Sequence, residues 1–271
     1  MITPGGSARV LAVIPGYQEG PRIADVVTRA RRHLPVLVVD DGSTDDTAAR
    51  AEAAGAIVLP LRPNRGKGAA LRMGFRHALA GGYEAVLTLD ADGQHDPDEI
   101  PSFLAAFGVP GLADPVGAPV AAAASPSAAA APSAVPGAAD PSIVAAAGPR
   151  PELVIGRRDF SRMPPVRRLS NTLGGAAFSW AVGQPIPDNQ SGYRLLGRRL
   201  MASMVDSRET GFEFEVEMIA ICIRRGWPLA WVPISTIYAG APSHVRPLHH
   251  LRHFVRATRA ARRLVRASDS V

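Results

Sequence analysis

Carboxylate side chains follow two short runs of apolar residues. Asp40 and Asp41 come directly after one run, and Asp90 and Asp92 come directly after another. Carboxylates gathered at one place repel one another unless cations or hydrogen-bond donors lie between them. An Asp-x-Asp pair at the end of a strand offers hard oxygen ligands to Mg²⁺ or Mn²⁺ and leaves positions open for a diphosphate. Asp90 and Asp92 are therefore predicted metal ligands, with Gln94 as a further ligand.

Other acidic residues nearby have a simpler interpretation. Asp45, Asp46, Asp96 and Asp98 stand where helices are expected to begin, so we interpret them as helix-capping residues. Asp41 is open to the same interpretation. Capping does not explain Asp40, Asp90 and Asp92, which follow the apolar runs directly.

The elements that must position these carboxylates alternate along the chain. Short apolar runs predict four strands, at 10–14, 36–39, 57–61 and 85–89. A segment with helical spacing follows each of them. A final strand is expected at 232–237. This order predicts an α/β fold with a mostly parallel sheet covered on both faces. Ligands bind at the carboxyl ends of the strands in such sheets, where the carboxylates are expected.

One segment differs from the rest in composition. Residues 108–149 contain 16 Ala, 8 Pro and 5 Gly, with neither a basic residue nor an aromatic one. Such a sequence buries too little apolar surface to offset the entropy of ordering. We predict a disordered insert that interrupts one domain spanning 8–245; a linker between two independent domains is the alternative.

Charge is distributed unevenly around this insert. Residues 1–107 carry 11 basic and 13 acidic side chains, whereas residues 150–271 carry 19 and 9. The segment 246–268 combines seven arginines with apolar residues at helical spacing, which predicts a basic amphipathic helix. An anionic membrane surface is the predicted partner and nucleic acid is not; a solvated helix docked on the domain is the alternative.

Cysteine content and hydropathy restrict the compartment. Cys222 is the single cysteine, so a disulfide scaffold is excluded. The sequence contains no apolar run long enough to span a membrane and no secretion signal at its N-terminus. We expect a cytoplasmic protein. We further expect it to attach peripherally to the inner face of the membrane.

Six motifs occur in an order that resembles family 2 glycosyltransferases, most closely the dolichyl- or polyprenyl-phosphate mannosyl- and glucosyltransferase branch. They are VIPGYQE (13–19), VVDDGSTDDT (38–47), NRGKGAALRMGF (64–75), LTLDADGQHDP (87–97), VIGRR (154–158) and DNQSGYR (188–194). The resemblance covers roughly residues 8–107 and 152–245 and implies the nucleotide-diphospho-sugar transferase fold called GT-A.

The resemblance also implies donor-binding residues. Pro15, Tyr17 and Glu19 would line the nucleotide pocket, and Asp40 would contact the base or ribose. Asp41 is also expected among the donor-binding residues. Asp90, Asp92 and Gln94 would hold Mg²⁺ or Mn²⁺ on the diphosphate. Lys67, the single lysine of the chain, would contact phosphate; a structural lysine at the start of a helix is the alternative.

The acceptor determines the remaining chemistry. A lipid phosphate is already anionic and needs cations, so Arg158 and Arg194 are predicted to bind the phosphate of a polyprenyl phosphate acceptor. Asp92 is also predicted to be a catalytic residue. A hydroxyl acceptor needs a base, for which Asp188 is the candidate; an orienting role is its alternative. We thus expect a metal-dependent inverting hexosyltransferase using a nucleotide-diphosphate sugar. The same fold with a hydroxyl acceptor, or a non-catalytic nucleotide-sugar-binding or membrane-surface module, are the alternatives.

Overall fold

The computed structural model describes residues 9–109, 149–162, 165–211, 213–235, 237 and 247–267. Seven strands form one sheet in the order β3-β2-β1-β4-β6-β5-β7. The strands are β1 (Val10–Gly16), β2 (Val36–Asp40), β3 (Ile57–Pro60), β4 (Ala85–Thr88), β5 (Leu153–Arg158), β6 (Arg194–Gly197) and β7 (Leu229–Ile234). This is the predicted α/β fold with a mostly parallel sheet.

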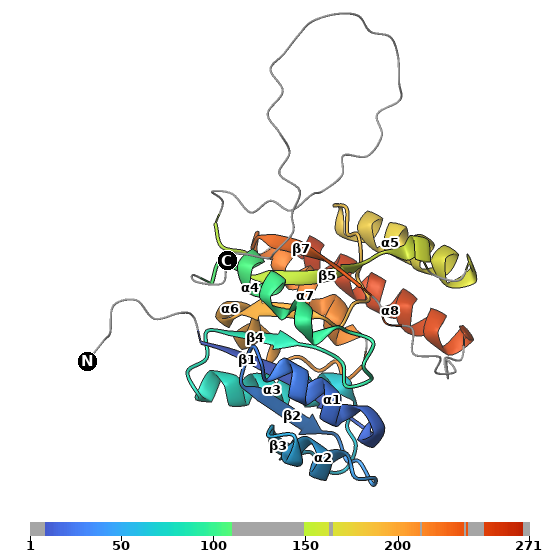
Figure 1. Ribbon diagram of the computed structural model, residues 1–271. Helices are drawn as coiled ribbons and strands as arrows, with labels where there is room; N and C mark the ends of the chain where they lie inside the picture. The colour runs from blue at the N-terminus through green and yellow to red at the C-terminus, as the bar shows by residue number, and fades with distance from the viewer. Residues whose placement is uncertain are drawn as a thin grey trace, which may run out of the picture.

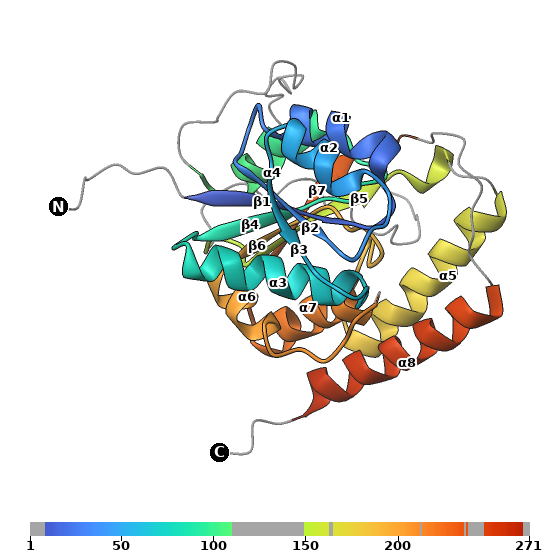
Figure 2. The same ribbon diagram turned by 90° about the horizontal axis from the view of Figure 1, so that it is seen from below.

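Helices cover both faces of the sheet (Figures 1 and 2). The α-helices are α1 (Gly20–Ala30), α2 (Thr47–Ala53), α3 (Lys67–Ala80), α4 (Ile100–Ala106), α5 (Pro165–Val182), α6 (Arg198–Met204), α7 (Glu213–Arg224) and α8 (Pro247–Arg266). Two short 3₁₀ helices, η1 (Pro97–Glu99) and η2 (Phe160–Arg162), complete the described elements.

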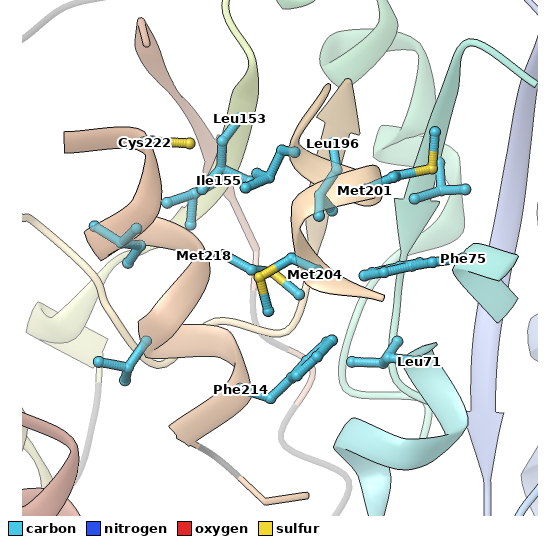
Figure 3. Packing of buried hydrophobic residues seen from close by; sticks show 14 of the residues in the cluster. Leu71, Phe75, Leu153, Ile155, Leu196, Met201, Met204, Phe214, Met218 and Cys222 are labelled. Carbon is cyan, nitrogen blue, oxygen red and sulfur yellow. The ribbon is translucent and has the colours of Figure 1, made fainter. Parts of the chain in front are cut away.

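Strict alternation along the strands creates two cores. In β1, Leu11 and Val13 face the cluster formed with α3, α6 and α7, whereas Ala12 and Ile14 face the cluster formed with α1 and α4. Figure 3 shows the first cluster, in which side chains of α3, α6 and α7 such as Phe75, Met204 and Phe214 meet beneath the sheet. Burial on both faces explains why these strands read as continuous apolar runs.

Strand β6 alone runs against its neighbours, and it was not among the strands expected from the sequence. It pairs antiparallel with both β4 and β5. Strand β5 ends at Arg158, and Asp188 lies shortly before β6. The two side chains form an ion pair, so both residues lie at the same edge of the sheet. The intervening α5 therefore does not return the chain to the opposite edge, and β6 must run back.

The last strand begins earlier than expected. The sequence predicts a strand at 232–237, whereas β7 covers Leu229–Ile234, where it pairs with β5 from Leu153 to Arg158. The partner strand sets these bounds, because a ladder extends only as far as both strands do.

The residues that flank the Ala/Pro-rich segment meet each other. The Arg150 Nε donates to the Phe107 carbonyl oxygen at 3.0 Å, and its guanidinium lies 4.0 Å from the centroid of the Phe107 ring. The predicted insert at 108–149 lies outside the described residues apart from its ends. The part of the sheet before the segment and the part after it share both hydrophobic clusters.

Candidate functional site

Two loops at the carboxyl ends of β1 and β2 are tied together. The Gln18 backbone N–H donates to Ser43 Oγ at 3.0 Å, and the Glu19 N–H donates to Thr47 Oγ1 at 2.8 Å. Gln18 has a positive φ of 57°, which turns the chain sharply after β1. The loop predicted to line a nucleotide pocket is thus held against the loop that follows Asp40.

Within this pair of loops, the predicted pocket residues differ in exposure. Pro15 lies at intermediate depth near the end of β1, and the Tyr17 side chain is 50% exposed. Glu19 is partly buried and accepts a hydrogen bond from Arg22 at 3.1 Å. Burial raises the pKa of Glu19, although the Arg22 contact opposes this shift.

Asp40 and Asp41 are both buried but have different surroundings. Asp40 Oδ1 accepts the Ser43 N–H at 3.2 Å, while its Oδ2 is buried with no hydrogen-bond partner in the described part of the chain. The two oxygens of Asp41 accept the N–H groups of Arg65 and Gly66 at 2.8 and 2.7 Å. Asp41 therefore anchors the turn before α3, and Asp40 has an oxygen left for a ligand.

The turn anchored by Asp41 delivers Lys67 to a pair of carboxylates. The Lys67 Nζ lies 2.5 Å from Asp90 Oδ1 and 2.8 Å from Glu215 Oε1. Gly192 lies against this cluster, because a Cβ there would come within 2.7 Å of Asp90 Oδ2 and 2.8 Å of Lys67 Nζ. Residues of α3, the loop after β4, α7 and the loop before β6 thus converge around one ammonium group.

Electrostatics within the cluster favour the charged forms. Burial alone would raise the pKa of Asp90, but the combined effect of Lys67, His95 and Arg158 lowers it. Burial likewise opposes charge on Lys67, yet Asp90 and Glu215 together raise its pKa. The site is therefore arranged for a cation facing Asp90.

Asp92 and Gln94 lie beside this cluster on the loop after β4. Asp92 Oδ1 accepts the Gln94 N–H at 3.0 Å, and the Gln94 side chain is exposed. The described residues contain no group of three or more His, Cys, Asp or Glu side chains that could hold a metal. The chain thus offers two carboxylates, which fits a divalent cation only if other ligands come from a bound phosphate or from water.

Arg158 and Asp188 form a bidentate pair at the same edge. Arg158 Nε and Nη2 donate to Asp188 Oδ2 and Oδ1 at 2.7 and 2.9 Å, and the Gln190 N–H also donates to Oδ1 at 3.0 Å. The Asp188 carboxylate is 1% exposed, against 18% for the Arg158 side chain. Both oxygens of the predicted base are therefore already occupied, and this arrangement suits an orienting role.

Arg194 has a different environment from the one expected. It is fully buried, and its guanidinium donates to the carbonyl oxygens of Ser191, Asn189 and Glu215. These bonds connect the loop before β6 to α7. The structure places Arg194 beneath the site as a brace for its backbone, with no face open to an acceptor phosphate.

Glu215 is the principal site residue that the sequence did not single out. It lies in the stretch GFEFEVEM (211–218), outside the six sequence motifs. In the structure, Glu215 pairs with Lys67, and Glu213 Oε1 accepts from Arg256 of α8 at 3.0 Å. A single lysine beside a carboxylate pair could have suggested a further acidic partner, but nothing local identified which one.

Comparison with known proteins identifies similar chains. Residues 11–134 match the family described as glycosyl transferase family 2. The polyprenol monophosphomannose synthase of Mycolicibacterium smegmatis is 29% identical, over 84% of this chain and 77% of that protein. The undecaprenyl-phosphate mannosyltransferase of Micrococcus luteus is also 29% identical, over 84% of each chain.

A solved structure shares the fold. The glucosyl-3-phosphoglycerate synthase of Mycobacterium tuberculosis, crystallised with Mn²⁺, uridine diphosphate and its glucosylated product, superposes with a TM-score of 0.61. The match covers 98% of this chain and 82% of that one at 21% identity. It confirms the predicted GT-A fold.

Proposed function

The chain carries a glycosyl transferase family 2 domain and is a glycosyltransferase, and on this premise we propose that it transfers a hexose to a polyprenyl phosphate. The donor would be a nucleotide-diphosphate sugar, and the anomeric configuration would invert. The acceptor is proposed to meet the enzyme at the cytoplasmic face of the membrane. The mannosyltransferases of Mycolicibacterium smegmatis and Micrococcus luteus, which are named for lipid phosphate acceptors, support this branch of the family.

The donor side of the proposal rests on Asp40, Lys67 and Asp90. A buried carboxylate oxygen without a partner, Asp40 Oδ2, suits an N–H or O–H donor of a base or ribose. Lys67 is positioned to exchange its contact with Asp90 for one with a phosphate oxygen. Asp41 serves the donor indirectly, because it holds the turn that presents Lys67.

Asp90 and Asp92 would hold a divalent cation together with the donor diphosphate. When bound, Mg²⁺ or Mn²⁺ would stabilise the negative charge that develops on the leaving diphosphate. The position of the Lys67 ammonium, 2.5 Å from Asp90 Oδ1, supports a cation at this carboxylate. The exposed Gln94 side chain would be available as an outer ligand.

The Arg158–Asp188 pair is the observation that favours a phosphate acceptor over a hydroxyl acceptor. The pair fixes a guanidinium at the carboxyl end of β5, close enough to Asp90 to lower its pKa. A phosphate acceptor needs such a cation and no base, since it is anionic near neutral pH. A hydroxyl acceptor needs a free base, whereas the Asp188 carboxylate has both oxygens engaged.

A transfer assay tests this proposal. Labelled UDP-glucose, GDP-mannose and related donors would be incubated with polyprenyl phosphate and Mn²⁺, and the lipid product would be extracted. Asp92→Asn should reduce transfer by at least about 100-fold, the size of effect seen when charge stabilisation of a leaving group is lost. Asp25→Asn, an exposed substitution on α1, is the matched control. Undiminished transfer by the Asp92 variant, or transfer only to hydroxyl acceptors, would refute the assignment.

A further inference from the structure

Helix α8 has an arginine face that forms no ion pair with an acidic residue of the described part of the chain. Arg259, Arg262, Arg263 and Arg266 line an open hollow of about 420 Å³. Their spacing places them on one side of the helix. In the described part of the chain, no carboxylate forms an ion pair with any of these four residues, whereas Arg256 one turn earlier contacts Glu209 and Glu213. The remaining arginines thus present uncompensated positive charge.

Exposed apolar side chains lie next to this face on α5. Trp180 is 70% exposed and Leu173 is 62% exposed, and both stand on one side of the helix. The Arg262 guanidinium lies 4.1 Å from the centroid of the Trp180 ring, so the charge and the aromatic surface are contiguous. Figures 1 and 2 show α5 and α8 side by side at the margin of the molecule.

Both helices also adjoin the catalytic edge of the sheet. Gly174 of α5 lies between two side chains, because a Cβ there would be 3.5 Å from the Phe254 ring of α8 and 3.8 Å from Gln190 Nε2 of the site loop. Arg256 of α8 contacts Glu213, at the N-terminus of the helix that supplies Glu215. A surface bound to α5 and α8 would therefore lie on the side of the molecule where these helices contact the Gln190 loop and α7.

We infer that the α5–α8 face, formed by Trp180 and Leu173 with Arg259, Arg262, Arg263 and Arg266, docks on an anionic lipid surface. Arginines would contact lipid phosphates, and the Trp180 ring would enter the headgroup region, where tryptophan is favoured. Exposed leucine and tryptophan beside the charge favour a lipid surface over nucleic acid. This inference rests on the proposed function, since docking would bring the site to a lipid-linked acceptor.

Sedimentation of the full chain with lipid vesicles tests the docking. Vesicles of phosphatidylcholine with added phosphatidylglycerol should bind the chain, and binding should weaken as salt increases. The triple variant Arg259→Gln, Arg263→Gln and Arg266→Gln should bind on the order of 100-fold more weakly, given the usual attraction of each basic residue to an anionic surface. Trp180→Ser should weaken binding several-fold while preserving the salt dependence.

A variant with the same charge loss elsewhere serves as the control. Arg32→Gln, Arg50→Gln and Arg225→Gln change three exposed arginines outside α5 and α8 and should leave vesicle binding within twofold of the wild type. Equal losses in the two triple variants, or equal sedimentation of the α8 variant and the wild type, would overturn the inference. Retention by double-stranded DNA at physiological salt without vesicle binding would assign the face to nucleic acid instead.

A second assay separates this inference from the proposed function. A short, water-soluble isoprenyl phosphate requires no membrane, so the α8 triple variant should transfer sugar to it as fast as the wild type. If the wild type binds vesicles but transfers to no isoprenyl phosphate, the proposed function fails and the docking stands. If transfer to the soluble acceptor succeeds and vesicle binding is absent, the docking alone fails.

Discussion

Lys67 Nζ lies 2.5 Å from Asp90 Oδ1. The ammonium group of the single lysine of the chain therefore contacts the first carboxylate of the Asp-x-Asp pair, the carboxylate predicted to bind a metal ion. The ammonium makes a second contact, 2.8 Å from Glu215 Oε1. A divalent ion that uses Asp90 would have to compete with this ammonium. Metal binding at Asp90 should therefore be linked to loss of the contact between Lys67 and Asp90.

The first prediction follows from that competition. Lys67→Met should raise the affinity for Mn²⁺ in the absence of donor by roughly tenfold, because Asp90 would lose its cationic neighbour. The free ion can be counted by its electron paramagnetic resonance signal during a titration. Lys67→Arg retains the charge and should bind Mn²⁺ like the wild type. Unchanged or weaker Mn²⁺ binding by the methionine variant, with its fold intact by circular dichroism, would show that the ammonium does not compete.

The Arg158–Asp188 pair provides the second prediction. Asp188→Asn should destabilise the fold by about 3 kcal/mol, since it removes the charge of a buried carboxylate that accepts two hydrogen bonds from the Arg158 guanidinium. It should also raise the KM for the acceptor more than it lowers kcat, because a misplaced Arg158 binds phosphate poorly. Urea unfolding and steady-state kinetics measure the two effects. Loss of the acidic limb of the pH profile, with the acceptor KM unchanged, would instead identify Asp188 as a base.

The contact between Phe107 and Arg150 leads to a third prediction. Because these residues already meet on either side of the Ala/Pro-rich segment, a short Gly/Ser bridge should replace residues 112–147 without moving β5. The shortened chain should keep its melting temperature within a few degrees and its affinity for the nucleotide donor within about twofold, as expected when a long loop contributes little beyond closure entropy. Differential scanning calorimetry and donor titration would measure both. An unfolded product would mean that the segment is structural.

Glu99 gives a prediction of pH dependence. Burial raises the pKa of Glu99, although its Oε1 accepts both the N–H and the hydroxyl of Ser235 at 2.8 Å. A carboxyl whose pKa is higher in the folded state contributes stability below its unfolded pKa of 4.5, and that contribution is lost as pH rises through the folded pKa. Glu99→Gln keeps the acceptor oxygen and cannot ionise. Its unfolding free energy should therefore increase relative to the wild type between pH 4 and pH 7.

Urea titrations of both proteins across that range would test the sign. At most one proton is involved, so the difference cannot change by more than about 1.4 kcal/mol per pH unit. Glu52→Gln, an exposed glutamate of α2, should show no such trend. A variant that loses stability relative to the wild type as pH rises would contradict the prediction.

Local patterns were sufficient for the positions of most strands and for the carboxylates at the edge of the sheet. The apolar runs before Asp40 and Asp90 predicted buried strands, and parallel strands bring their carboxyl ends to one edge by geometry alone. The placement of Asp90 and Asp92 on the loop after β4 therefore followed from the sequence. The antiparallel direction of β6 did not follow from the sequence, because the direction of a strand depends on the edge of the sheet at which the preceding segment ends.

The partners of the charged residues were decided by the tertiary structure. Sequence motifs identified Lys67, Arg158, Asp188 and Arg194 as chemically important, but only packing showed that Arg194 is buried on backbone carbonyls and that Asp188 holds Arg158. Glu215 reaches Lys67 because α3 and α7 pack on the same face of the sheet, although the two residues lie far apart in the chain. Periodicity and spacing act over one element at a time, whereas an ion pair between elements depends on how those elements pack.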